Sequence, residues 1–177
     1  MTSLCLPSSP AAKAASAAST SGRSRPPRPV AAVLADRLDD VPVVDEAARL
    51  AVARGAPLLL IAVLPPLLPR AAAAAPDGAT ARAVLGRALP HLARAGIGFE
   101  PAVCHRPAGR GGRLRAARDL LDVAIAHGCS RLVVSRSGPE GLDASTVMEA
   151  AAIRGGPFVH EAPPVPWAPL TAPRSLV

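Results

Sequence analysis

Glycine, serine and threonine residues gather between positions 135 and 146, directly after a short apolar run. The segment reads SRSGPEGLDAST. Gly138 and Gly141 could let backbone N–H groups approach a phosphate. Ser145 and Thr146 stand where a helical pattern begins, and a helix N-terminus carries partial positive charge. Together with Ser135 at the end of the apolar run, these residue types predict an anion-binding turn.

Two further candidates follow or end apolar runs. Asp36 comes directly after VAAVLA, and Val63 ends LLLIAV. In an open parallel sheet, ligands bind beyond the carboxyl ends of the strands, so both positions could face the same ligand. An acid after a strand is also a common turn residue, and Thr146 forms a T-x-x-E capping box with Glu149. A plain turn and a simple helix cap are therefore the alternatives at Asp36 and Thr146.

An arginine-rich stretch offers a second place for an anion. Its glycines could let the backbone fold round a phosphate-bearing partner, and cations at the start of a helix are unfavourable unless an anion is present. A solvated basic face near Asp119 and Asp122 is the alternative. The stretch contains Gly109, Gly111 and Gly112 beside Arg106, Arg110, Arg113, Arg115 and Arg118.

Catalytic patterns are weak. The serines near position 135 lack a G-x-S-x-G elbow. The four histidines and three cysteines are too scattered to indicate a metal site, and nothing places a histidine beside a serine and an acid. We do not expect an enzyme, although a nucleotide-acting hydrolase or phosphotransferase stays as the alternative.

Short apolar runs and helical patterns alternate along the chain. The runs predict five strands, at Val30–Ala35, Leu58–Val63, Phe99–Cys104, Leu132–Ser135 and Pro157–His160. Four amphipathic patterns lie between them. The first pattern ends at Gly55, and its inner face carries Val44, Ala47, Ala48, Ala51 and Val52. The second runs from Ala81 to Ala95, with Thr80 as N-cap, Pro90 as a kink or break and Gly96 at its end. The fourth runs from Thr146 to Gly155, and the inner face of the third carries Leu114, Ala117, Leu121, Ala124 and Ile125.

This order of elements predicts an α/β fold. Strands joined through helices most readily form right-handed parallel crossovers, which gives a doubly wound five-stranded parallel sheet with helices on both faces. The last strand, at positions 157–160, should lie at a sheet edge. The ligand site should lie where the strand order reverses.

Composition and charge set the limits of the domain. Half of the residues are apolar and only 2% are aromatic, which weighs against stacking on single-stranded nucleic acid. The net charge of +7 divides into +4 over residues 1–29, +2 over 30–162 and +1 from Arg174, so no nucleic-acid surface is needed to explain it. We expect a disordered tail or transit peptide at 1–29, a domain at 30–162, and a proline-rich tail at 163–177. In that last tail, Trp167 is the residue suited to docking on the domain.

The cysteines and the lengths of the apolar stretches indicate the cellular compartment. An odd number of widely spaced cysteines indicates a reducing compartment, and no apolar stretch reaches the roughly 18 residues needed to span a bilayer. We therefore expect a cytoplasmic protein. An organelle is the alternative if the acid-free, Ser/Ala-rich N-terminus is a transit peptide.

Three segments in this order resemble the universal stress protein family, over positions 30–162. They are VAAVLAD with RGAPLLLIAV, then ARAGIGFEPAVCH, and finally CSRLVVSRSG with STVMEAAAIRGGPFV. The resemblance implies an adenine nucleotide alpha hydrolase-like fold and a regulatory module in the stress response. It also implies a homodimer in which the terminal strand pairs with its copy.

Many members of this family hold ATP through a G-x-x-G loop, a spacer, and Gly-Ser or Gly-Thr at the next helix. Here Ser135 replaces the first glycine, Gly138 keeps the second, and the spacer is contracted before Ser145, which stands for the third. The resemblance thus implies weakened or lost binding of ATP or AMP. The implied nucleotide-binding residues are Asp36, Val63, Ser135, Gly138, Gly141, Ser145 and Thr146. An interaction scaffold that uses basic tails is a further alternative.

Overall fold

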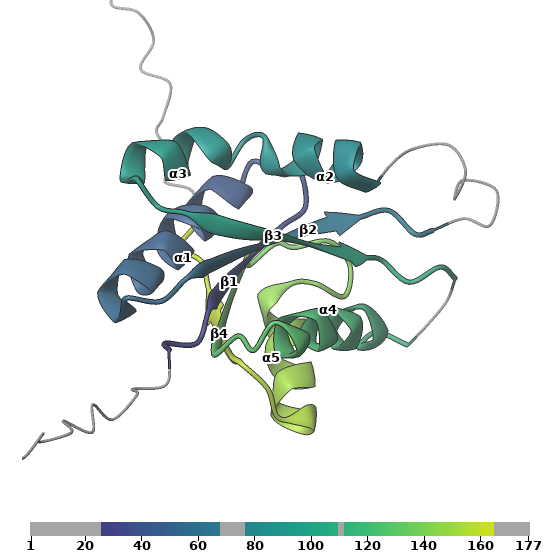
Figure 1. Ribbon diagram of the computed structural model, residues 1–177. Helices are drawn as coiled ribbons and strands as arrows, with labels where there is room; N and C mark the ends of the chain where they lie inside the picture. Colours follow the sequence, from purple (N-terminus) through teal and green to yellow (C-terminus); the bar gives the residue numbers. More distant parts are fainter. Residues whose placement is uncertain (1–25, 68–76, 110–111, 165–177) are drawn as a thin grey trace, which may run out of the picture.

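The continuous Val, Leu and Ala runs form a sheet whose central strands are covered on both faces. The computed structural model describes residues 26–67, 77–109 and 112–164 (Figure 1). All strand pairs are parallel, and the order is β3-β2-β1-β4-β5. The predicted five-stranded parallel sheet is confirmed, with the last strand at an edge. The strands are β1 (Val30–Leu34), β2 (Leu58–Leu64), β3 (Phe99–His105), β4 (Arg131–Val134) and β5 (Phe158–Glu161).

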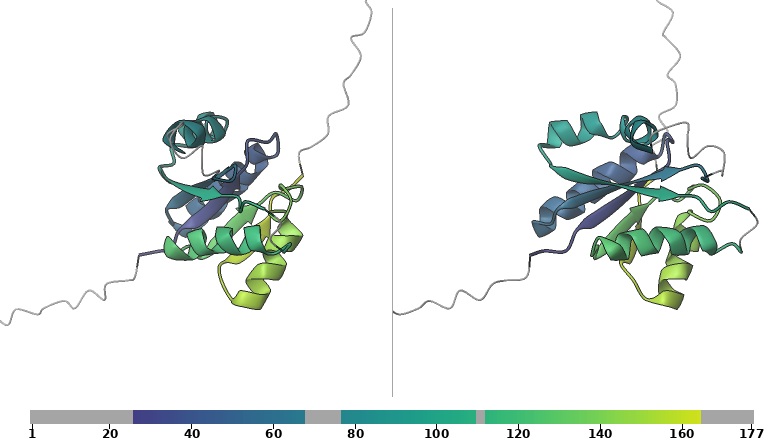
Figure 2. Two further views of the ribbon diagram at one scale, coloured as in Figure 1. Left: turned by 90° about the vertical axis from the view of Figure 1, so that its right-hand side faces the viewer. Right: turned by 45° about the vertical axis from the view of Figure 1, so that its right-hand side comes forward.

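The helices cover the sheet from both sides, as Figure 2 shows. α1 (Asp40–Arg54), α2 (Asp77–Leu85) and α3 (Leu89–Ala95) pack on one face, and α4 (Arg115–Ala126) and α5 (Ala144–Arg154) pack on the other. Every residue of β1 and β2 is buried, with alternate side chains entering the two cores. Each fully buried Val or Leu side chain contributes roughly 1.5–3 kcal/mol relative to an exposed one, so both faces of the sheet favour being covered by helices.

The sequence predicted where the helices end better than where they begin. Gly55 and Gly96 close α1 and α3 in the left-handed conformation, with φ of 57° and 63°. The predicted helix at 81–95 is two helices, because Pro90 can occupy only a first turn and α3 begins just before it. The N-cap prediction for Thr80 is wrong, since α2 begins at Asp77 and Thr80 lies inside it.

Two residues assigned to inner helix faces are exposed. Val52 in α1 is 66% exposed and Ile125 in α4 is 42% exposed. Each lies eight positions after a buried residue, and at 3.6 residues per turn eight positions rotate about 80° beyond that residue. Both side chains therefore fall outside the buried stripe. Among the residues that the structure describes, none of the helices has the length and hydropathy required to cross a membrane.

Candidate functional site at the switch point

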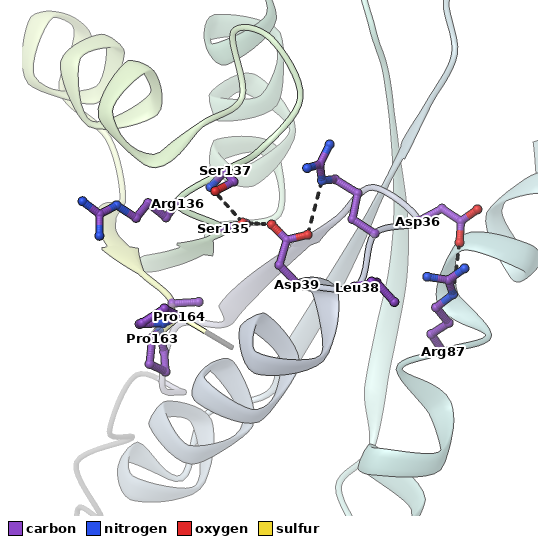
Figure 3. Close-up of a pocket in the computed structure, with 11 residues that line it drawn as sticks. Asp36, Leu38, Asp39, Arg87, Ser135, Arg136, Ser137, Pro163 and Pro164 are labelled. Carbon is purple, nitrogen blue, oxygen red and sulfur yellow. Dashed lines mark hydrogen bonds and ion pairs between the residues drawn. The ribbon is translucent and has the colours of Figure 1, made fainter. Parts of the chain in front are cut away.

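The strand order reverses between β1 and β4, and these two strands are paired in the middle of the sheet. A pocket of about 690 Å³ opens beyond their carboxyl ends (Figure 3). The sequence-predicted residues Asp36 and Ser135 both line it. The remaining lining residues come from the turn after β1, the α2–α3 connection, the turn after β4 and the segment after β5: Arg37, Leu38, Asp39, Arg87, Arg136, Ser137, Ala162, Pro163 and Pro164.

The turn between β1 and α1 is held by a buried carboxylate that the sequence analysis did not single out. Asp40 is 3% exposed, and its two oxygens accept hydrogen bonds from Ala35 N at 3.1 Å and Arg37 N at 3.0 Å. Burial raises the pKa of Asp40, although these backbone hydrogen bonds work to lower it. Two consecutive acids directly before a helical pattern were the available signal, since acids are favoured in a first turn.

Asp36 occupies this turn in a conformation that few side chains adopt. Its φ of 56° lies in the left-handed region, and Arg87 Nε lies 3.5 Å from its Oδ1. Both side chains are about half exposed, so the ion pair is worth less than about 1 kcal/mol. The Asp36 carboxylate is therefore accessible from the pocket without being locked by its partner.

Asp39 joins the two halves of the pocket. Ser135 Oγ donates a hydrogen bond to Asp39 Oδ2 and accepts one from Ser137 N at 3.1 Å. Arg37 Nε lies 3.3 Å from Asp39 Oδ1 on the other side. Ser135 thus ties the end of β4 to the N-cap of α1 with its side chain, which a glycine at that position could not do.

Every charged side chain in the pocket wall has an opposite charge beside it. Arg37 pairs with Asp39, Arg87 pairs with Asp36, and Arg136 Nε lies 3.7 Å from Glu161 Oε1. The wall therefore presents little uncompensated positive charge to an anion. A ligand carrying several negative charges would have to compete with these acids.

The N-terminus of α5 is occupied by the protein's own carboxylate. Asp143 is the N-cap: its Oδ1 accepts from Thr146 N at 3.0 Å and from Ser145 Oγ at 2.5 Å. Its Oδ2 accepts from Thr146 Oγ1 at 2.8 Å. Partial burial works to raise the pKa of Asp143, but the hydrogen bonds from Ser145 and Thr146 together outweigh it and lower the pKa to about 2.

The predicted capping box at Thr146 is therefore wrong. Asp143 starts the helix three positions earlier, and Thr146 is buried in the first turn. Glu149 does not reach back to a cap; its Oε2 lies 3.2 Å from Arg113 Nη2. Arg113 Nε also donates to Thr146 Oγ1 at 3.4 Å, which links α5 to the residues before α4.

Both glycines of the loop between β4 and α5 are required by packing within the protein. A Cβ on Gly138 would lie 2.3 Å from Leu142 O, which no real Cβ could do. Gly141 has a φ of 79°, and a Cβ there would meet Arg113 O at 3.0 Å. The loop also bonds to itself, with Leu142 N donating to Pro139 O at 2.8 Å. Contact with a phosphate stays a prediction for these two residues.

The other predicted residues lie apart from the pocket. Val63 is 6% exposed and packs in the core beneath α4 and α5, and neither it, Gly138, Ser145 nor Thr146 lines the pocket. Gly141 lines a second, smaller pocket of about 230 Å³ together with five residues of the arginine-rich stretch: Arg106, Gly109, Gly112, Arg113 and Arg115. Arg110 and Gly111 of that stretch lie outside the described residues.

The histidine and cysteine side chains within residues 26–67, 77–109 and 112–164 lie outside the lining of the switch-point pocket. No three His, Cys, Asp or Glu side chains among them could hold a metal ion together. Burial raises the pKa values of Cys104 and Cys129 to about 11, so both thiols stay protonated at neutral pH. No histidine lines the switch-point pocket, although His160 of β5 contacts Arg131 of β4.

Comparison with known proteins finds the fold among solved structures. No protein-family model matches the chain, and no curated protein gives a significant match. Among solved structures, a universal stress protein from Archaeoglobus fulgidus is 20% identical, with 77% of this chain and 93% of that chain covered and a TM-score of 0.55.

Two further solved structures carry nucleotides. A universal stress protein from Archaeoglobus fulgidus in complex with dAMP is 19% identical, covers 77% of this chain and 98% of its own, and has a TM-score of 0.53. A universal stress protein in complex with cAMP is 20% identical, with coverage of 78% and 98% and a TM-score of 0.52. The chain therefore has the universal stress protein fold, as the sequence resemblance implied.

Proposed function

We propose that this chain is a non-catalytic regulatory module of the universal stress protein kind, which binds an adenine nucleotide weakly at the switch-point pocket and acts in the stress response. One observation carries the proposal: an open pocket of about 690 Å³ lies at the reversal of strand order in a fold whose solved examples include complexes with dAMP and cAMP. The accessible carboxylate of Asp36 can accept a hydrogen bond from the exocyclic amine of adenine.

The α5 N-terminus argues for a nucleoside monophosphate over a triphosphate. A helix N-terminus binds phosphate through free backbone N–H groups and its partial positive charge. Here Asp143 already accepts from Thr146 N and brings its own negative charge. Additional phosphates would meet that carboxylate, so they should add little affinity.

The paired charges of the pocket wall explain why binding should be weak. A phosphate that approached Arg37 or Arg87 would compete with Asp39 or Asp36 for the same guanidinium. The favourable Coulomb energy of a new pair is then largely offset by the pair that it replaces.

A calorimetric titration with AMP and with ATP, each with and without magnesium, tests the proposal. We expect dissociation constants for the two nucleotides within about threefold of each other, a difference below 1 kcal/mol. ATP binding that is tenfold tighter than AMP binding would contradict the argument from Asp143. If neither AMP nor ATP binds, the pocket does not bind adenine nucleotides.

Asp36→Asn should weaken AMP binding about tenfold, because a hydrogen bond to a charged group is worth about 1.5–3 kcal/mol. Asp45→Asn is the matched control, since Asp45 is also exposed and pairs with a base, His91, at 3.2 Å but lies outside the pocket. If the two variants weaken AMP binding equally, the nucleotide does not bind at the switch-point pocket.

We also propose that the module is a homodimer through β5. The strand is at the sheet edge, and its residue Phe158 is 65% exposed. Phe158 N donates to Ser130 O just before β4, and Ala162 N donates to Val134 O of β4, both at 2.9 Å. Strand alternation therefore points Glu161 N toward the free edge. An unpaired edge of this kind is a template for a second strand.

The dimer is tested by light scattering of Glu161→Pro, which removes an edge donor and leaves the bonds to β4 in place. We expect a monomer from this variant and a dimer from Glu161→Ala, which removes only the carboxylate. A dimer that survives Glu161→Pro would mean that another surface forms it.

A further inference from the structure

Three side chains form a cluster on one face of the sheet at its β5 edge: Arg131, Phe158 and His160. Arg131 is the first residue of β4 and pairs with Phe158 in the strand register, and His160 follows two positions later on the same face. Arg131 Cζ lies 5.4 Å from the centroid of the Phe158 ring, and the rings of Phe158 and His160 are 4.7 Å apart. Arg131 Nη1 contacts His160 Nε2. We call these three residues the edge cluster.

The contact between Arg131 and His160 requires one form of the imidazole. A guanidinium can only donate hydrogen bonds, so His160 Nε2 is the acceptor. An imidazole has an accepting nitrogen only when it is neutral, because both nitrogens carry protons in the charged form. The folded edge therefore selects neutral His160. Protonation would remove the acceptor and place two positive charges side by side.

The charged groups that face His160 come from two elements. β4 contributes Arg131. α1, which packs on the same face of the sheet, contributes Glu46, Arg49 and Arg54. Arg49 Nη2 lies 2.5 Å from Glu46 Oε1, so the acid of this set already has a basic partner. α5 packs on the opposite face of the sheet and brings no charge to this side. The surroundings of His160 are therefore net positive.

These surroundings fix how the stability contributed by His160 depends on pH. Burial lowers the pKa of His160 from its ordinary value of 6.5; Arg131, Arg54 and Arg49 lower it further, whereas Glu46 raises it. Because the pKa is lowered on folding, the unfolded chain binds the proton more readily than the folded chain does. The contribution of His160 to the free energy of unfolding is thus complete above pH 6.5 and is lost as the pH falls through the folded-state pKa.

From this geometry we propose that His160 is a pH-sensitive latch that holds the edge strand β5 on β4. In its neutral form it accepts a hydrogen bond from Arg131, whose guanidinium also lies over the Phe158 ring. When His160 is protonated, Arg131 is repelled, the contact between the strands is lost and β5 frays. Within the chain, β5 has four residues and β4 as its sole neighbouring strand, so one lost contact is enough to loosen it.

Amide hydrogen exchange of the full chain tests the latch. The N–H groups of Phe158 and Ala162 donate at 2.9 Å to β4 and to the residue just before it, so their exchange reports the pairing of the two strands. Arg106 N, which donates to β2 at the opposite edge of the sheet, is the reference. After correction for intrinsic exchange rates, we expect the protection of both β5 amides to fall about tenfold from about pH 7.5 to about pH 5, as for the loss of one hydrogen bond to a charged group. The protection of Arg106 N should stay unchanged.

Two variants and a matched control assign the effect to the edge cluster. His160→Gln does not titrate but keeps an oxygen that can accept from Arg131, so its β5 protection should not depend on pH. Arg131→Gln removes the neighbouring cation, so the loss of protection in acid should be smaller than in the unchanged chain. His127→Gln is the control, because it also removes a partly exposed histidine but lies at the end of α4, beside Glu100. It should keep the full tenfold loss, on the order of one hydrogen bond.

Three results would overturn the latch. If the protection of the β5 amides in the unchanged chain does not change with pH, protonation of His160 does not loosen the strand. If the loss persists in His160→Gln, or appears equally at Arg106 N, another group causes it. If Arg131→Gln loses as much protection in acid as the unchanged chain does, Arg131 plays no part; this last comparison also decides the matter should His160→Gln fail to fold.

The link to assembly is tested separately, and this arm alone rests on the proposed dimer through β5. A dimer that pairs β5 with its copy should dissociate more readily when the strand frays, so light scattering should report a dissociation constant about tenfold higher in acid. His160→Gln should dissociate equally at both pH values. If the unchanged chain is a monomer throughout while the exchange result holds, the dimer proposal fails and the latch stands. If a dimer forms whose dissociation ignores pH, it uses a surface other than β5.

Discussion

The carboxyl ends of β1 and β4 lie side by side in one sheet, yet the chain leaves them in opposite ways. After β1 it turns through Asp36 at a positive φ and leaves the pocket open beside it. After β4 it folds tightly on itself, with Gly138 against the backbone of Leu142, and closes at the Asp143 cap. After β1, the carboxylate of Asp36 is accessible from the pocket. After β4, the carboxylate of Asp143 caps the N-terminus of α5.

This difference separates two properties that a nucleotide site normally combines. The open side offers volume and hydrogen-bond acceptors, and the closed side holds the helix N-terminus that would bind phosphate. The closed side is held by hydrogen bonds within residues 135–146 and by two contacts from outside them, Ser135 with Asp39 and Thr146 with Arg113. Substitutions on the two sides should therefore change different quantities, which is how the comparison can be tested.

The largest effect is expected at Gly138. Gly138→Ala would place a Cβ 2.3 Å from Leu142 O, and the backbone of the loop would have to shift. We expect unfolding to become easier by about 1–3 kcal/mol, measured by chemical denaturation. Gly98→Ala is the control, because nothing lies within 4 Å of a Cβ there. Equal stabilities of the two variants would show that the loop is open enough to hold a phosphate.

Asp143→Ala should cost about 1 kcal/mol of stability through loss of the N-cap. It should also free Thr146 N and remove a negative charge, so that ATP gains affinity relative to AMP. Ser145→Ala is the control, since it removes a donor to Asp143 but keeps the cap. A variant that loses stability while the ratio of AMP to ATP affinity stays unchanged would show that phosphates never approach α5.

Lowering the pH should remove the contribution that Asp143, on the closed side, makes to the free energy of unfolding. The folded-state pKa of Asp143 is lowered to about 2 from an ordinary value of 3.8, so its contribution to stability is complete above 3.8 and is lost as the pH falls through 2. Asp40, whose pKa is raised, contributes in the opposite direction. The stability difference between the unchanged chain and Asp143→Asn isolates Asp143. That difference should shrink between pH 4 and pH 2, on the ordinary pKa scale of carboxylates.

The smallest effect on stability is expected on the open side, for Asp36→Gly. Asp36→Ala forces an alanine into the left-handed region and should cost about 1 kcal/mol. Asp36→Gly relieves that strain but adds freedom to the unfolded chain, so its stability should lie within about 0.5 kcal/mol of the unchanged chain. Denaturation of both variants measures the difference. An alanine variant as stable as the glycine variant would mean that the turn does not require a positive φ.

The sheet could be predicted because its signals are local and repeated. LLLIAV and VAAVLA are apolar at every position, and a run of that kind and length is typical of a strand covered on both faces of a sheet. The edge position of β5 and the glycine ends of α1 and α3 followed from equally local features. The start of α5 did not, because Asp143 and Thr146 are both good N-cap residues and only the folded loop decides between them.

The pocket could be predicted only in part. Asp36 and Ser135 could be predicted from the sequence because each follows a strand that reaches the switch point. Arg87 and Pro163 were not, because they reach the pocket from connections whose paths depend on how the helices pack. The role of Gly138 was open to misinterpretation, since a glycine that approaches a phosphate and one that approaches its own backbone look the same in a sequence.

The pairing of β1 with β4 also has a consequence for when the pocket can form during folding. Val30 pairs with Arg131, which lies 101 positions later in the chain. Closing so long a loop costs several kcal/mol of chain entropy before any contact compensates, so this pairing should form late. Until then, β1 has β2 as its only neighbour and presents a fully apolar open edge. During synthesis, the switch-point pocket can therefore form only after Pro164, the last of its lining residues, has emerged.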